Sequence, residues 1–354
     1  MVRDGAPVRF ALPTFVSLPE DVTLMTVDRR GFIATAATLA LAGTARAENP
    51  AATPAAGDPG APVWPPSDSL PLWAGPPPGM PATPPVLAPT MNGAAGHREL
   101  WIRGVATPMI HIFRPHRPNG AALLAIPGGG YGFLSVQNEG LDVARFYNAR
   151  GYTVFMLSYR LPGEGWTKRS DVPLQDGQRA MRLIRAGARR FGIDPGRVGI
   201  LGFSAGGHLA ASLVTNHGKP VYAPVDAADQ QSARPDFAGL IYPVTTLETH
   251  STHAGSRDNL LGPNPSAKLV ADRSPLRHID ARTPPCFLVH ALDDDVVPVA
   301  CSIDWMLACR AAKVPVEAHL LERGGHGFGL HLADDNSGAL WPEQFLRWAS
   351  SHQG

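Results

Sequence analysis

An apolar strand pattern that runs directly into a glycine-serine-glycine turn constrains the fold of this chain most. Residues 198–201 are mainly apolar, G-F-S-A-G follows at 202–206, and an alanine-rich helix pattern comes next. The serine of such a G-x-S-x-G motif occupies a strained strand-to-helix turn, and its flanking glycines lack the bulk that would separate strand from helix. Its hydroxyl projects above the sheet, where the helix dipole favours negative charge. We therefore predict Ser204 as a nucleophile; the alternative is a tight turn with a capping serine.

Strand and helix patterns alternate through residues 91–354, which we predict to form one catalytic domain of the α/β class. The expected architecture is a mainly parallel eight-stranded sheet with helices on both faces. Predicted strands are 98–103, 108–113, 121–126, 152–158, 197–202, 237–242, 286–291 and 316–321. Predicted helices are 139–150, 174–191, 204–216, 302–313 and 340–350. Two irregular stretches, 217–235 and 245–275, are predicted to form a lid or pocket walls.

Three adjacent carboxylates follow the predicted strand at 286–291. They are Asp293, Asp294 and Asp295, and Val-Val-Pro comes next. In hydrolases whose loop ends D-x-V-V-P, the acid lies four residues before the proline. This spacing selects Asp294, and we expect the other two carboxylates to be solvated. The role of such an acid is to hold an imidazole in one tautomer and to stabilise its charged form.

A glycine-rich loop after the last predicted strand contains the candidate base. His326 lies in G-G-H-G-F-G at 324–329, where the glycines allow the loop to fold toward the serine. Of the 13 histidines, it alone has this setting. The chain order serine, aspartate, histidine is that of the α/β-hydrolase fold. We therefore predict a catalytic triad of Ser204, Asp294 and His326.

Three consecutive glycines at 128–130 follow the apolar strand pattern at 121–126. Glycines at this place leave backbone N–H groups open to an oxyanion, and we predict the donors to be Gly129 or Gly130 together with Ala205. A phosphate-binding loop is the competing interpretation. It is disfavoured because no G-K-[ST] follows and no G-x-G-x-x-G precedes a helix with a distant acid.

Charge and histidine spacing argue against other ligand classes. The net charge is +1, with 31 basic and 30 acidic residues, so we expect no nucleic-acid binding. His250 and His253 have metal-ligand spacing, but no third ligand follows them, and we predict neither a metal nor a cofactor. His208 and His290 are expected to be structural. Three cysteines are predicted to be buried thiols: Cys286, Cys301 and Cys309.

The N-terminal residues resemble a twin-arginine export signal. Asp-Arg-Arg-Gly at 28–31 precedes an apolar run at 33–43, and Ala-Arg-Ala at 45–47 matches a cleavage pattern. The run is too short to span a bilayer. We therefore predict a signal at 1–47 and a periplasmic or secreted protein without a membrane span after cleavage. A start at Met25 would give a more compact basic region and leave 1–24 untranslated.

Proline is concentrated in the next segment, 48–90. Its first part, up to about Pro66, is predicted to be a polyproline-like linker. The second part includes Trp73, and we predict an extended N-terminal arm that lies on the catalytic domain.

Several motifs resemble those of bacterial esterases grouped with acetyl-xylan esterases, over about residues 70–350. They are P-G-G-G-Y at 127–131, N-E-G at 138–140, S-Y-R-L at 158–161, P-L-Q-D at 173–176, G-F-S-A-G-G-H at 202–208 and G-H-G-F-G at 325–329. Many relatives carry a histidine where this chain has Pro127. The resemblance implies a serine esterase that removes O-acetyl groups from xylan or related carbohydrates.

Aromatic residues near these motifs are candidates for the substrate pocket: Tyr131, Phe133 and Trp166. They either stack on a sugar or line an apolar pocket. The rival functions are a short-chain esterase or lipase, a peptidase-like serine hydrolase, and a sugar-binding protein on a hydrolase scaffold. A peptidase of the prolyl-oligopeptidase type would bring an N-terminal propeller, which the first 90 residues cannot form. The expected substrate is a small-molecule or polysaccharide ester.

Overall fold

The computed structural model describes residues 53–54, 61–93, 98–249 and 251–353. The chain divides into two units, Met1–Ala47 and Glu48–Gly354, and every described residue lies in the second. The predicted export signal and the start of the linker therefore lie outside the described residues and stay predictions.

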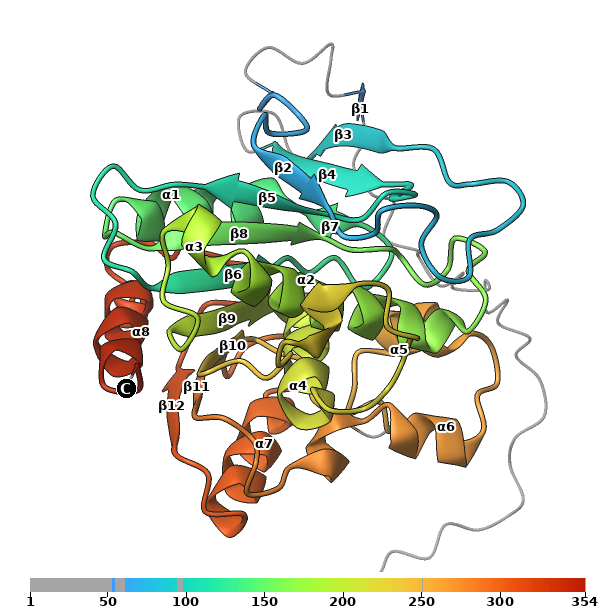
Figure 1. The fold of residues 1–354 in the computed structure, drawn as a ribbon. Helices are drawn as coiled ribbons and strands as arrows, with labels where there is room; N and C mark the ends of the chain where they lie inside the picture. Colours follow the sequence, from blue (N-terminus) through green and yellow to red (C-terminus); the bar gives the residue numbers. More distant parts are fainter. Residues whose placement is uncertain (1–52, 55–60, 94–97, 250, 354) are drawn as a thin grey trace, which may run out of the picture. The chain divides into compact units, whose positions relative to one another are not determined.

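The main sheet has eight strands, as predicted, and is mostly parallel (Figure 1). Its order is β12-β11-β10-β9-β6-β8-β5-β2, with the first six parallel to one another and the last two antiparallel to their neighbours. The strands are β2 (Ser69–Pro71), β5 (Met109–Phe113), β6 (Ala122–Ile126), β8 (Thr153–Ser158), β9 (Val198–Phe203), β10 (Ala238–Ile241), β11 (Cys286–Ala291) and β12 (Val316–Leu321).

The predicted strand at 98–103 belongs to a second sheet rather than to the main one. This antiparallel sheet has the order β1-β3-β4-β7, with β1 (Thr53–Pro54), β3 (Ala88–Asn92), β4 (Glu99–Arg103) and β7 (Leu134–Ser135). The eighth strand of the main sheet is instead β2, from the proline-dense segment. As an edge strand, β2 tolerates Pro71 because it needs hydrogen bonds on one side only.

Helices cover both faces of the main sheet, as predicted. They are α1 (Asp142–Asn148), α2 (Val172–Ala186), α3 (Ala188–Phe191), α4 (Ser204–Asn216), α5 (Ala254–Leu261), α6 (Ala267–Asp272), α7 (Ala300–Ala311) and α8 (Trp341–Ser350). Successive side chains of each strand point to opposite faces of the sheet and so pack in different hydrophobic cores. On β6, Leu124 packs in the core with α2, α4 and α7, whereas Leu123 packs in the core with α1 and α8.

The N-terminal arm is anchored by a buried ion pair. Arg160 and Asp176 have no exposed side-chain surface and lie 2.8 Å apart. Trp73 Nε1 donates to Asp176 Oδ1 at 2.9 Å, and the Arg160 guanidinium lies 4.8 Å from the centre of the Trp166 ring. The S-Y-R-L and P-L-Q-D motifs therefore fix the arm to the domain, and Trp166 is a packing residue of this cluster.

The two irregular stretches differ from one another in the structure. Residues 245–275 contain the short helices α5 and α6. Residues 217–235 contain a 3-10 turn, Ala227–Gln230, which lies against α2. All three cysteines are buried free thiols, as predicted.

Strand register brings the loops that carry the predicted site to one edge of the sheet. Ile126 at the end of β6 pairs with Gly202 on β9. The carboxyl ends of β10, β11 and β12 continue the same edge on the other side. Ligand sites of parallel sheets lie at this edge.

Candidate active site

Ser204 occupies a strained turn between β9 and α4. Its φ is +52°, a left-handed value that side chains other than glycine rarely adopt. The turn needs close packing, because a Cβ at Gly206 would lie 2.2 Å from the carbonyl oxygen of Ile126. Helix α4 therefore begins directly against the loop that follows β6, with Ser204 only 5% exposed.

His326 connects Ser204 to Asp294. Ser204 Oγ donates to His326 Nε2 at 2.9 Å, and His326 Nδ1 donates to Asp294 Oδ2 at 2.7 Å. These three side chains come from the loops after β9, β11 and β12, so residues 122 positions apart in sequence meet at the sheet edge. The structure thus brings the predicted triad together with the hydrogen bonds that general-base catalysis requires.

The Asp294 carboxylate accepts hydrogen bonds on both oxygens. Val296 N and Val297 N donate to Oδ1 at 2.9 and 2.8 Å, and His290 Nε2 donates to Oδ2 at 3.1 Å. Burial opposes the charged form, but the hydrogen bonds from His290 and His326 outweigh it and hold the pKa of Asp294 well below its ordinary value. The acid is therefore ionised.

Hydrogen bonds fix the loop after β6 in place. Tyr159 Oη donates to the carbonyl oxygen of Pro127 at 2.9 Å. Gly128 N donates to Glu139 Oε2 at 2.6 Å, and its carbonyl accepts from Ser135 N at 3.1 Å. The Pro127–Gly128 peptide and the Gly128–Gly129 peptide, which carries the Gly129 N–H, are thereby held.

The predicted donors Gly129 and Gly130 keep their N–H groups available. In the described part of the chain, neither group donates a hydrogen bond. Gly129 has φ +119°, and a Cβ there would lie 2.2 Å from the carbonyl oxygen of Phe133. Only glycine fits this conformation at position 129. The loop presents the N–H groups of Gly129 and Gly130 as two backbone donors beside Ser204.

A cavity of about 450 Å³ opens over Ser204. Glu99, Trp101 and Arg103 line it because they occupy one face of β4, while Leu100 and Ile102 on the other face are fully buried. The Trp101 ring stacks on the ring of Phe133, with centroids 3.7 Å apart. The remaining lining residues are Gly129, Gly130, Gly132, Ser135, Asn138, Glu139, Ser204, His253, Asn259, Val296, His326 and Gly327.

Phe133 is thus placed in the cavity wall, but Tyr131 and Trp166 are not. Tyr131 points into the core, where its hydroxyl donates to His208 Nδ1 at 2.7 Å. His208 Nε2 donates in turn to the carbonyl oxygen of Arg273 at 2.9 Å. Burial lowers the pKa of His208 to about 4, so the ring is neutral. The expectation of a substrate-pocket role for Tyr131 and Trp166 is therefore corrected.

Sequence reasoning missed several residues of this wall. The sequence predicts Trp101 on a strand, but it wrongly predicts that this strand belongs to the main sheet. Its alternating pattern E-L-W-I-R is the signal that one face is exposed. Asn259 and His253 come from the irregular stretch 245–275 and confirm it as a pocket wall, whereas 217–235 contributes no lining residue to this cavity.

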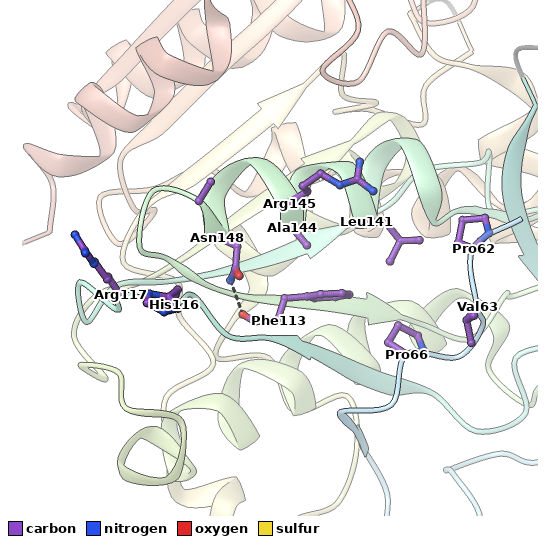
Figure 2. Close-up of a pocket in the computed structure, with 11 residues that line it drawn as sticks. Pro62, Val63, Pro66, Phe113, His116, Arg117, Leu141, Ala144, Arg145 and Asn148 are labelled. Carbon is purple, nitrogen blue, oxygen red and sulfur yellow. Dashed lines mark hydrogen bonds between the residues drawn. The ribbon is translucent and has the colours of Figure 1, made fainter. Parts of the chain in front are cut away.

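A second hollow of about 590 Å³ lies elsewhere, between α1 and the start of the described arm (Figure 2). Pro62, Val63 and Pro66 line one side, and Asn148, whose Nδ2 donates to the carbonyl of Phe113 at 2.8 Å, lies on the other. It contains none of the predicted site residues.

Among the described residues, no group of three or more histidine, cysteine, aspartate or glutamate side chains is arranged to hold a metal ion. His253 caps α5 by accepting from Ser256 N at 3.3 Å, and His250 lies outside the described residues. No helix in the described ranges is both long and apolar enough to cross a membrane.

Comparisons with known proteins identify the family of this chain. The BD-FAE family profile matches residues 110–307, more than half of the chain. The acetylxylan esterase of Xylanibacter ruminicola is 34% identical over 221 residues, which cover 61% of this chain and 43% of the relative. Endo-1,4-beta-xylanase B of Butyrivibrio fibrisolvens is 37% identical over 224 residues, 62% of this chain and 34% of that protein. The chain spans less than half the length of these two relatives.

A solved structure shares most of the fold. The acetyl ester-xyloside bifunctional hydrolase of Caldicellulosiruptor lactoaceticus has a TM-score of 0.67 and 32% identity. The match covers 81% of this chain and 97% of that protein. An esterase of Thermogutta terrifontis with bound propionate is 25% identical, with a TM-score of 0.55 over 69% of this chain and 88% of the esterase. The chain therefore belongs to the BD-FAE family and has the α/β-hydrolase fold.

Proposed function

We propose that this chain is a serine esterase in which Ser204 is the nucleophile, His326 the general base and Asp294 the acid that orients His326. One observation carries the proposal. His326 connects Ser204 Oγ at 2.9 Å and Asp294 Oδ2 at 2.7 Å beside a cavity lined by Gly129 and Gly130, whose N–H groups donate to no described residue.

In the first step, Ser204 Oγ bonds to the ester carbonyl carbon while its proton moves to His326 Nε2. The carbonyl oxygen becomes an oxyanion, which accepts hydrogen bonds from the N–H groups of Gly129, Gly130 and Ala205. The positive end of the α4 dipole lies at the same place and stabilises the negative charge. Asp294 stabilises the imidazolium that forms.

The intermediate then collapses. The bond between the carbonyl carbon and the leaving alcohol oxygen breaks, and the alcohol oxygen takes the proton from His326 Nε2. The acyl group remains on Ser204. A water molecule repeats the sequence, giving its proton to His326 as it attacks, and the acid product leaves when Ser204 regains a proton.

We propose O-acetylated xylan or a related carbohydrate as the substrate. Two relatives, an acetylxylan esterase and an acetyl ester-xyloside hydrolase, bear names that fit this chemistry. The stacked rings of Trp101 and Phe133 in the cavity wall supply a flat apolar surface of the kind on which a sugar ring packs.

Acetate release from acetylated xylan tests this proposal, with Ser204→Ala as the control. Release that disappears in the control supports a polysaccharide deacetylase. Activity confined to nitrophenyl acetate would remove the xylan assignment and keep the esterase. Rates that rise from acetate to butyrate would favour a lipase-like pocket instead. Absence of both hydrolysis and covalent labelling by a fluorophosphonate would favour a sugar-binding protein.

We also propose export through the arginine pair Arg29–Arg30. Expression of the full chain with export machinery should give a protein that begins at Glu48, as found by N-terminal sequencing. Replacing both arginines with lysine should keep the chain in the cytoplasm. A variant exported as efficiently as the wild type would contradict this assignment.

A further inference from the structure

The N-E-G motif at 138–140 has no role in the triad chemistry, yet two of its side chains line the cavity over Ser204. It lies in a single π-helical turn, Gln137–Leu141, directly before α1. Such turns are rare and often occur at functional sites. The Asn138 and Glu139 side chains both lie in the wall of this cavity.

Glu139 connects the loop after β6 to the loop that carries His326. Its Oε2 accepts from Gly128 N at 2.6 Å, and its Oε1 accepts from Tyr242 Oη at 2.8 Å. The same Tyr242 Oη accepts from Gly329 N at 2.9 Å. One buried carboxylate is therefore linked to the backbone of both loops.

Asn138 holds the same histidine loop at a second point. Its Nδ2 donates to the carbonyl oxygen of Gly327 at 2.8 Å, one residue after His326. The Tyr242 ring packs against the imidazole, with centroids 4.8 Å apart. Because this loop contains three glycines with positive φ, it needs such external contacts to keep one conformation.

We propose that Glu139 is a positioning residue that sets the oxyanion donors and His326 relative to Ser204. The inference rests on the proposed esterase function. Gly128 directly precedes the predicted donors Gly129 and Gly130, so a shift of its peptide would move both N–H groups. Misplacement of reacting groups by about 1 Å can lower a rate about a hundredfold.

An ionised carboxylate accepts from both partners of Glu139 at once. Gly128 N–H can only donate, and the Tyr242 hydroxyl donates its proton to Glu139 while its oxygen accepts from Gly329 N. A glutamine would turn its NH₂ group, and a protonated carboxyl group its O–H, toward Gly128 N–H or toward the Tyr242 hydroxyl, which would then have to reverse its hydrogen bond. The proposal therefore predicts that protonation of Glu139 inactivates the enzyme.

The groups around Glu139 set its pKa in a pH range where activity can be measured. Burial, with a smaller contribution from the Glu99 carboxylate on β4, raises its pKa, and the bonds from Gly128 and Tyr242 and the nearby His326 lower it, so that the pKa lies at about 7. The Tyr159 hydroxyl, also close to Glu139, is neutral because burial raises its pKa. Glu139 is thus a titrating group that we expect to contribute to the acid limb of the pH profile.

The experiment is the pH dependence of kcat/KM for nitrophenyl acetate. In the wild type, log kcat/KM should fall toward low pH, and protonation of Glu139 should contribute about one to the limiting slope. Glu139→Gln should lower kcat about tenfold to a hundredfold, leave KM within about threefold, and reduce the limiting slope by about one.

Glu164→Gln is the matched control. Glu164 also has a pKa raised by burial and accepts a backbone N–H, from Gly104 at 2.6 Å, but it does not line the cavity. This variant should keep the wild-type rate and slope. Thermal unfolding over the same pH range distinguishes loss of fold from loss of activity.

Tyr242→Phe provides a second variant that retains Glu139. Removing the hydroxyl takes away a hydrogen bond that lowers the pKa of Glu139, so the acid limb should move to higher pH while its slope stays at the wild-type value. A Glu139→Gln enzyme with the wild-type slope or the wild-type rate would overturn the inference. A wild type without any hydrolysis that Ser204→Ala abolishes would instead overturn the proposed function.

Discussion

Replacing Asp294 with asparagine should disable the base without removing it. The carboxylate accepts from two backbone N–H groups on Oδ1 and from two histidine nitrogens on Oδ2. Asparagine has one acceptor oxygen. If this oxygen stays with Val296 N and Val297 N, the NH₂ group faces His326 Nδ1 and forces that nitrogen to become an acceptor.

The consequence is the wrong tautomer of His326. Its proton then sits on Nε2, where it points at Ser204 Oγ and cannot accept the serine proton. The buried His290 does not relieve this conflict, because its Nε2 also lies 3.0 Å from the Val297 carbonyl and so remains a donor. Loss of the correct tautomer in a triad lowers kcat about 10⁴-fold, or about 5 kcal/mol of transition-state stabilisation.

Steady-state hydrolysis of nitrophenyl acetate measures this effect. Asp294→Asn should lower kcat about 10⁴-fold and leave KM nearly unchanged, since the variant changes neither the cavity wall nor the oxyanion donors. Asp295→Asn is the matched control, because that exposed neighbour should keep the rate within about twofold. An Asp294→Asn enzyme with more than about a tenth of the wild-type kcat, or equal losses in both variants, would refute the reasoning.

Three further predictions concern packing, pH and substrate binding. Gly206→Ala should lower the free energy of unfolding by about 1–3 kcal/mol and reduce activity, because its Cβ would meet the Ile126 carbonyl at 2.2 Å, whereas Gly218→Ala, with nothing within 4 Å, should do neither. His208 has a folded pKa of about 4, below its unfolded value, so the unfolded state binds more protons between about pH 6.5 and 4. When the pH is lowered through that range, the free energy of unfolding measured in urea should fall by about 3 kcal/mol more for the wild type than for His208→Gln. Trp101→Ala should raise KM for acetylated xylo-oligosaccharides about tenfold and leave KM for nitrophenyl acetate unchanged; equal changes for both substrates would argue against sugar stacking.

Ser204 and His326 could be predicted as members of the proposed triad because each lies in a local pattern with a physical cause, whereas Asp294 was selected from the spacing in hydrolases whose loop ends D-x-V-V-P. The strained turn at Ser204 requires small neighbours at 202 and 206, and the His326 loop requires glycines. The residues that meet these requirements are close neighbours of Ser204 and His326 in the sequence. The prediction of eight strands in the main sheet was also correct, but one of the eight was assigned wrongly. The strand predicted at 98–103, β4, pairs with β3 in the second sheet, and β2 completes the main sheet. Pairing partners of short strands depend on contacts between distant segments, which a local pattern does not contain.

Pocket residues were predicted less well for the same reason. Tyr131 is one residue after the predicted donors, but a φ of +60° turns its side chain into the core, toward His208. Trp166 was predicted to line the pocket because it is an aromatic residue in a loop, but its ring packs against the buried Arg160 guanidinium. Trp101, which does line the cavity, comes from a strand about 100 residues before Ser204.

The sequence by itself determined the fold class and the local settings of Ser204 and His326, since strained turns and glycine-rich loops are local requirements of the backbone. Only the tertiary structure decided which residues surround them. The Glu139 carboxylate lies 11 positions from Gly128 and 103 from Tyr242 in sequence, yet it bonds to both. A hydrogen bond depends on distance in space, and the folding of the chain alone sets that distance.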